Sequence, residues 1–249
     1  MKSRPILFNA PMVRAIPSGR KRLTRRIVKP MKNCPLPSGD GWALSMDSHG
    51  YGGLWREELG GVSSVPLPRC PYGELGDELW VREAWGFRGT TWHGSGAPDE
   101  VLIEYLADGT RRSIEFPHDT VKSMKLPEQR RLRIDESQDD YREYLHQFWK
   151  QSRPSIFMPR WASRITLVVE DVRIERLQDI SEDDAIAEGV TKMPNVEVSE
   201  LSGPFHVEAE VGTWPTARDC YRELWRSING PDSWALNPWV WVVKFAVKP

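Results

Sequence analysis

Cysteines and long apolar runs are scarce or missing in this 249-residue chain. Its three cysteines, Cys34, Cys70 and Cys220, are far apart and form no C-x-x-C pair, so we expect neither a disulfide framework nor a structural zinc site. No apolar run approaches the roughly 18 residues of a membrane span, and the first residues do not predict a secretory signal. We therefore expect a cytoplasmic protein that contacts no membrane and uses neither a metal nor another cofactor.

Acidic residues are also missing from positions 1–32, although the whole chain has a formal net charge of only -1. A segment of this kind attracts phosphates and other anions. A solvated basic face, balanced by acids elsewhere in the fold, is the plain alternative. The basic residues of the segment are Lys2, Arg4, Arg14, Arg20, Lys21, Arg22, Arg25, Arg26, Lys29 and Lys32.

The densest group of reactive side chains lies at residues 19–26, with the sequence Gly-Arg-Lys-Arg-Leu-Thr-Arg-Arg. A helix is predicted to open at Asn9 or Ala10 and to end at Pro17-Ser18-Gly19. The sequence therefore predicts a short turn just past the helix end that carries an amine, a hydroxyl and several guanidinium groups. Such a turn suits a polar, anionic ligand.

The rest of the chain predicts many strands and few helices. Strands are expected at 78–83, at 165–177 with a bulge near Asp171, and at 239–247, where apolar residues on both faces indicate a central strand. Asp108-Gly109 predicts a tight hairpin turn between strands 101–106 and 111–116, and a further hairpin is expected within 41–55.

Three further helices are expected. One follows Ser181 and ends at a left-handed Gly189, because Ser181 to Asp184 resembles a capping box. A second covers 216–228 and turns Cys220, Leu224, Trp225 and Ile228 inward, and a third covers 139–150 with an aromatic stripe that packs in the core. Together these elements predict an α+β fold with a curved sheet or small β-barrel and flanking helices.

Several motifs in combination resemble the ASCH domain family, and in particular its enlarged members carried by bacteriophages and prophages. The match covers residues 5–32, 70–85 and 158–249. Its motifs are Phe8-x-x-Pro11-Met12, the G-x-K-x-x-T-x-R element from Gly19 to Arg26, Gly76-Asp77-x-Leu79-Trp80-Val81, Ile180 to Gly189, and Trp241-Val242-Val243-Lys244-Phe245.

The resemblance implies a PUA-like barrel formed by residues 1–85 and 156–249, with 86–155 as a large insertion. It also implies RNA, DNA or a modified nucleoside as the partner. Some small bacterial members of the family are amidohydrolases that remove the acetyl group from N4-acetylcytidine with a Lys, a Thr and a Glu. Those positions correspond to Lys21, Thr24 and Glu188. Other relatives are described as ribonucleases.

The residue chemistry is compatible with amide hydrolysis, which needs a nucleophile, a base and donors for the oxyanion. Thr24 supplies a hydroxyl, and Lys21 can act as the base if burial lowers the pKa of its amine. Glu188 would then hold the base or protonate the leaving amine. Substrate contacts are assigned to Arg20, Arg25, Arg26, Trp80 and Glu83.

Other interpretations stay open for the same residues. Lys21 can be one more solvated cation, Thr24 can cap a turn, and Glu188 can pair with Arg26 to hold its helix in place. A nucleic-acid-binding module without catalysis would use some of the twelve tryptophans to stack on bases. A phage assembly factor would use residues 86–155 as a protein interface.

Overall fold

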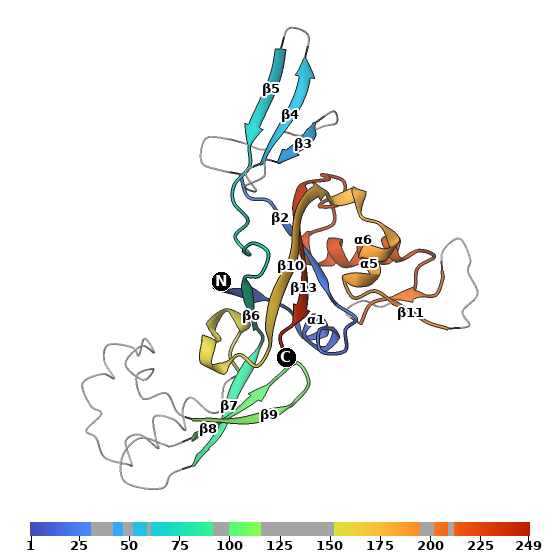
Figure 1. Ribbon diagram of the computed structural model, residues 1–249. Coiled ribbons are helices and arrows are strands. Elements are labelled where there is room, and N and C mark those ends of the chain that lie inside the picture. The colour runs from blue at the N-terminus through green and yellow to red at the C-terminus, as the bar shows by residue number, and fades with distance from the viewer. Residues whose placement is uncertain are drawn as a thin grey trace. The chain divides into compact units, whose positions relative to one another are not determined.

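The computed structural model describes residues 1–30, 42–46, 52–58, 61–91, 100–115, 152–194, 202–208 and 212–249 (Figure 1). This part of the chain is rich in strands and has few helices, which confirms the α+β class. The helix predicted at 139–150 and most of the segment 86–155 lie outside the described residues. The interpretation of 86–155 as an insertion therefore stays a prediction.

The largest sheet has five strands in the order β1-β6-β10-β13-β2. The prediction of a central position for the C-terminal strand is confirmed, because β13 lies between β10 and β2. The sheet ends at β1 and β2, so the described strands do not close into a hydrogen-bonded barrel. The strands are β1 (Ser3–Leu7), β2 (Leu23–Ile27), β6 (Glu78–Arg82), β10 (Thr166–Arg176) and β13 (Trp239–Val247).

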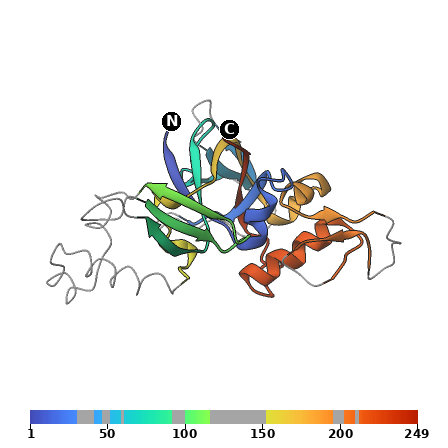
Figure 2. The same ribbon diagram turned by 90° about the horizontal axis from the view of Figure 1, so that it is seen from below.

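Three smaller sheets accompany it. Strands β3 (Ala43–Met46), β4 (Gly52–Glu58) and β5 (Gly61–Pro66) form an antiparallel sheet, which extends the hairpin predicted at 41–55. Strands β7 (Trp85–Thr91), β8 (Glu100–Tyr105) and β9 (Arg111–Glu115) form another (Figure 2), and Gly109 makes the predicted turn with a φ of 72°. The third consists of β11 (Thr191–Lys192) and β12 (Phe205–His206).

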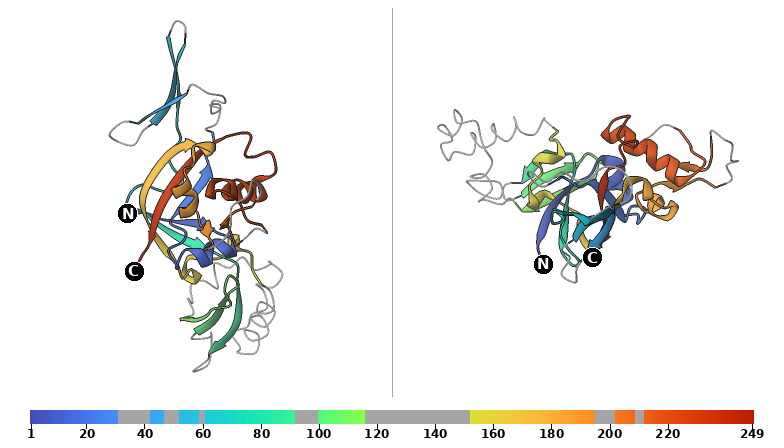
Figure 3. Two further views of the ribbon diagram at one scale, coloured as in Figure 1. Left: turned by 90° about the vertical axis from the view of Figure 1, so that its right-hand side faces the viewer. Right: turned by 90° about the horizontal axis from the view of Figure 1, so that it is seen from above.

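The helices are α1 (Ala10–Ala15), α5 (Glu182–Ala187) and α6 (Ala217–Asn229), with 3-10 turns η1 (Ser155–Phe157), η2 (Arg160–Ala162) and η3 (Leu177–Asp179). Both predicted ends of α5 are confirmed, because Ser181 accepts a hydrogen bond from the Asp184 amide and Gly189 has a φ of 111°. Figure 3 shows α5 and α6 together on one side of β10, β13 and β2.

Register decides which side chains of the five-stranded sheet share a face. The predicted bulge is present in β10, where the pairing with β13 shifts between Val169 and Asp171. Beyond the bulge, Arg173 and Glu175 lie opposite Val242 and Val240, and Arg25 of β2 also lies opposite Val242. Directly paired residues point to the same face, so these three charged side chains lie on the face that α5 and α6 cover.

The chain divides into two compact units, each with its own core. Unit 1 is Met1–Arg4, Ala15–Leu79 and Leu167–Pro249, and its core includes Leu177, Ala185, Cys220, Leu224, Trp225 and Val242. Unit 2 is Pro5–Arg14 and Trp80–Thr166, and its core includes Trp85, Phe87, Val101, Ile103 and Tyr105. The prediction that Ile228 faces inward is wrong, because its side chain at the end of α6 is half exposed.

Candidate functional site

The turn between α1 and β2 is attached to the end of α5. Lys21 and Glu188 form an isolated antiparallel bridge, and the Arg22 amide donates to the Ala187 carbonyl over 2.8 Å. The bridge brings together two side chains that are 167 positions apart in the sequence. Both are buried, with side-chain exposures of 0% for Lys21 and 3% for Glu188.

The Lys21 ammonium has three acceptors within hydrogen-bonding distance. Nζ donates to the Glu188 carboxylate (Oε2, 2.6 Å), to the Glu188 carbonyl (2.8 Å) and to the Leu23 carbonyl (2.9 Å). A protonated lysine has three N–H donors, so each of them has an acceptor here. Strand β2 lies at the edge of the sheet. The Lys21 amine therefore provides a hydrogen-bond donor for the Leu23 carbonyl of an edge strand.

Burial lowers the pKa of the Lys21 amine below its ordinary value, although the Glu188 carboxylate opposes that shift. The positive charges of Arg26 and Arg25 lower it further. The amine is therefore held by strong acceptors in a place where losing its proton is easier than in water. This combination is compatible with a group that gives up a proton when one of its contacts changes.

The second oxygen of Glu188 faces a tyrosine and an arginine. Tyr221 of α6 donates its hydroxyl to Oε1 over 3.4 Å, and Nη1 of Arg25 lies 3.6 Å from the same oxygen. Burial, with the negative charge of Glu188, raises the pKa of Tyr221 well above its ordinary value. Tyr221 therefore keeps its proton and acts as a donor at any physiological pH.

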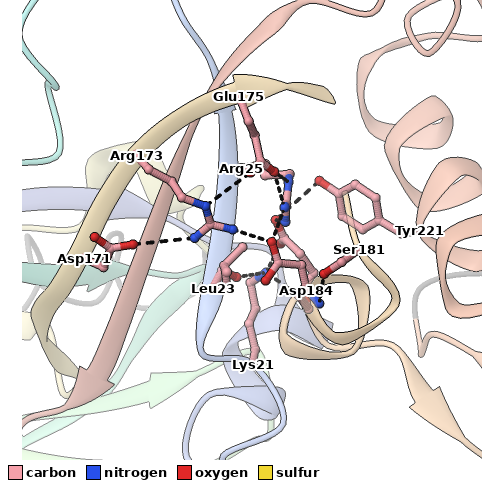
Figure 4. A network of polar contacts seen from close by, with 10 residues as sticks. Lys21, Leu23, Arg25, Asp171, Arg173, Glu175, Ser181, Asp184 and Tyr221 are labelled. Atoms are coloured by element: carbon pink, nitrogen blue, oxygen red, sulfur yellow. Dashed lines mark hydrogen bonds and ion pairs between the residues drawn. The ribbon is translucent and has the colours of Figure 1, made fainter. Parts of the chain in front are cut away.

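Arg25 is the centre of a wider ionic network (Figure 4). Its Nη2 donates to Glu175 of β10 and, over 2.6 Å, to Asp184 of α5, while its Nε donates to Glu175 over 3.0 Å. Arg173 binds both Asp184 and Glu175 from the sheet. The network therefore connects β2, β10 and α5 around a guanidinium that is fully buried.

One nitrogen of Arg25 stays without a hydrogen bond in the part of the chain that the structure describes. Nη1 is buried and has only the 3.6 Å contact with Glu188. A buried donor left in this condition costs about 1–3 kcal/mol. It is therefore a natural place for an additional acceptor, such as a ligand oxygen.

Thr24 is buried on β2 but belongs to the other face of the sheet from Arg25. It pairs with Val243, whereas Leu23 and Arg25 pair with Lys244 and Val242, and successive strand residues point to opposite faces. Thr24 is nevertheless close along the backbone, since its nitrogen is bonded to the Leu23 carbonyl carbon whose oxygen accepts from Lys21.

Arg20 and Arg26 lie at the borders of this cluster. Arg20 is partly exposed, donates from Nε to the Ser18 hydroxyl over 3.0 Å and lies 3.9 Å from Glu208. Arg26 is partly buried on β2, next to Arg25 in the sequence, and acts on the Lys21 amine through its charge. Both predicted substrate-binding residues therefore belong to unit 1 together with Lys21.

Trp80 and Glu83, the other predicted substrate-binding residues, belong to unit 2. The Glu83 carboxylate is buried and binds Arg164 through two hydrogen bonds of 2.8 and 2.9 Å. Burial raises the pKa of Glu83, which Arg164 opposes. Trp80 is almost fully buried, and the guanidinium carbon of Arg82 lies 4.6 Å from its ring centroid.

The structure corrects two expectations: that residues 23–26 form a turn and that Lys21 is a solvated cation. Residues 23–26 are part of strand β2, not of a turn, because they pair with β13. Lys21 is buried, not solvated. The side chain of Glu188, for which the plain alternative is a pair with Arg26, makes ion pairs with Lys21 and Arg25.

Sequence reasoning missed four members of the cluster: Arg173, Glu175, Asp184 and Tyr221. In the sequence, Arg173 and Glu175 of β10 and Asp184 of α5 have the pattern of ordinary charged residues on a strand and a helix. Tyr221 gave no signal of a functional role, because it occurs among the apolar residues of α6. The only available signal was the spacing of Arg173 and Glu175, which places both on the same face of a strand.

Comparison with known proteins returned no match of the chain to a family model, a curated protein or a solved structure. Among the described residues, no helix combines the length and the apolar character that crossing a membrane requires. The same residues contain no group of three or more His, Cys, Asp or Glu side chains arranged to hold a metal ion.

Proposed function

We propose that the chain is an ASCH-type protein with a PUA-like fold that binds a modified cytidine and hydrolyses its N4-acyl group at the Lys21–Glu188 site. The single observation that carries this proposal is the 2.6 Å contact between a buried amine and a buried carboxylate from distant parts of the sequence. A buried amine with a lowered pKa beside a buried carboxylate is typical of a site that moves protons.

Each residue has a role in the proposed reaction. When the ligand displaces a contact of Lys21, the proton on Nζ passes to Glu188 across the short contact between them, which leaves a neutral amine. That amine takes the proton of the Thr24 hydroxyl as its oxygen attacks the acyl carbon. Glu188 then protonates the departing N4 amine of cytidine, and water hydrolyses the acyl ester on Thr24.

Arg25 supports Glu188 in this proposal. Its side chain lies on the opposite face of the sheet from Thr24, so we do not assign it to the acyl oxygen, but its Nη1 lies 3.6 Å from Oε1 of Glu188. This contact orients the carboxylate that accepts the proton of Lys21 and later gives it to the departing amine.

A module that binds nucleic acid without catalysis is the second candidate, and one observation favours it. All three protons of Lys21 already have acceptors, as expected for a pair that attaches α5 to the edge of the sheet. In that case the same residues maintain the fold of a binding domain, and no acyl product forms.

The test is release of cytidine from N4-acetylcytidine, followed by liquid chromatography. The wild-type chain should release cytidine, and Thr24→Ala and Glu188→Gln should each lower the rate by about 100-fold or more, with circular dichroism unchanged. Thr91→Ala, a matched change of an exposed threonine in unit 2, should leave the rate unaltered. Unchanged turnover in Thr24→Ala would reject the nucleophile, and wild-type protein that binds nucleic acid but forms no product would select the second candidate.

A further inference from the structure

An exposed aromatic ring stands beside arginines on unit 2, away from the residues of the proposed reaction in the sequence. Phe157 and Ile156 of η1 have exposures of 66% and 57%. Arg82 donates from Nη1 to the Ile156 carbonyl over 3.2 Å, which holds its guanidinium against this turn. We call Arg82, Ile156, Phe157 and Arg160 the Phe157 surface.

Arg82 and Arg160 share one aromatic support. Their guanidinium carbons lie 4.6 and 6.0 Å from the ring centroid of Trp80. Trp80 is buried, so it orients the two cations but offers little ring surface of its own. Phe157 is the member of this group with an accessible ring.

The two arginines have no ion pair with a carboxylate in the described part of the chain. Three acids of unit 2 are occupied elsewhere: Glu83 and Asp108 bind Arg164, and Glu104 binds Arg88 and Arg111. The described residues of unit 2 include arginines but no lysine. Their arginines are Arg14, Arg82, Arg88, Arg111, Arg112, Arg153, Arg160 and Arg164, and their acids are Glu83, Glu100, Glu104, Asp108 and Glu115.

We propose that the Phe157 surface binds single-stranded nucleic acid, with a base stacked on Phe157 and phosphates on Arg82 and Arg160. Arginine suits this role because its planar guanidinium pairs with phosphate in a forked geometry. An exposed ring beside such cations is the arrangement that binds unpaired bases without sequence preference. An acidic peptide would use the cations but would leave the ring without a stacking partner.

The proposal goes beyond the deacylation proposed above and does not depend on it, because none of its residues belongs to unit 1. The ligand class differs as well, since a strand of nucleic acid engages phosphates that a free nucleoside lacks.

The test measures fluorescence anisotropy of a labelled 12-nucleotide oligouridine at several salt concentrations with the full chain. Phe157→Ala should weaken binding by about tenfold at every salt concentration, because it removes stacking. Arg160→Ala should also weaken binding and should reduce the slope of log affinity against log salt by somewhat less than one, since one phosphate contact is lost. Both side chains are exposed, so folding should be unaffected.

Matched controls come from unit 1. Leu236→Ala removes an apolar side chain that is 75% exposed, and Arg226→Ala removes a partly exposed arginine; both should bind like the wild type. Wild-type affinity in Phe157→Ala, or equal competition by polyglutamate, would overturn the proposal. Thr24→Ala should bind normally, so a failure of the proposed reaction would not affect this result.

Discussion

A buried ammonium stabilises a fold only while its acceptors stay in place. Lys21 combines a fully buried amine with a carboxylate and two carbonyls. Removing the amine leaves the Glu188 carboxylate buried beside only the longer contacts to Arg25 and Tyr221. The same residue is therefore central to stability and to the proposed chemistry, and the two roles must be measured separately.

We expect Lys21→Met to lower the free energy of unfolding by about 3 kcal/mol, because it leaves a buried charge without its partner. Lys21→Met combined with Glu188→Leu should recover a large part of that loss, since both charges are then gone. Urea denaturation followed by tryptophan fluorescence measures both values. Lys192→Met, a change of an exposed lysine in the same unit, is the control. A single variant as stable as the wild type would contradict the structural role.

At the scale of elements, the turn before β6 is joined to the N-terminal strand by one carboxylate. Asp77 accepts hydrogen bonds from the Lys2 amide (2.7 Å), the Arg4 guanidinium (2.5 Å) and the Glu74 amide (3.3 Å). Gly73 has a φ of 103°, and a Cβ there would lie 2.6 Å from Nη1 of Arg4. The turn thus needs both a glycine and an ionised aspartate.

The Lys2 amide and the Arg4 guanidinium lower the pKa of Asp77 from 3.8 to about 2. A carboxyl whose pKa is lower in the folded chain stabilises the fold above its unfolded pKa. This stability is lost as the pH falls through about 4 to about 2. We expect Asp77→Asn to lower the melting temperature at pH 5 and to be less sensitive to acid over this range. Thermal denaturation from pH 5 to pH 2 tests this, with Asp179→Asn, an exposed aspartate, as the control; identical acid profiles for Asp77→Asn and wild type would contradict it.

At the scale of the whole molecule, each unit has a buried apolar cluster of its own among the described residues. The core of unit 1 lies between α5, α6 and the strands β2 and β13, whereas that of unit 2 is built on β7 and β8. The two clusters have no residue in common. Because the two clusters share no residue, each unit is a candidate for local unfolding independent of the other.

Leu224→Ala and Ile103→Ala remove comparable buried side chains from the cores of unit 1 and unit 2. Each should cost about 2–5 kcal/mol in its own core. Hydrogen exchange read by mass spectrometry should show faster exchange of unit 1 in Leu224→Ala and of unit 2 in Ile103→Ala. Equal acceleration of both units in either variant would show that the chain opens as one cooperative body.

Much of the local structure follows from short stretches of sequence. The serine cap of α5, the positive φ of Gly109 and Gly189, and the bulge near Asp171 were all predicted from neighbouring residues, and the structure confirms them. Such features depend on hydrogen bonds and backbone preferences that act over a few positions. Ile228 shows the limit, because its helix position indicated burial but about half of its side chain is exposed in the part of the chain that the structure describes.

The sequence by itself determined the α+β class, the position of β13 within its sheet, and the presence of an amine, a hydroxyl and a carboxylate in recognisable motifs. Only the tertiary structure decided that Lys21 meets Glu188, that Arg25 binds Glu175 and Asp184, and that Thr24 faces away from Arg25. These pairings join positions up to 167 residues apart. Their geometry comes from strand register and from the packing of α5 on the sheet, for which no local pattern of residues is a signal.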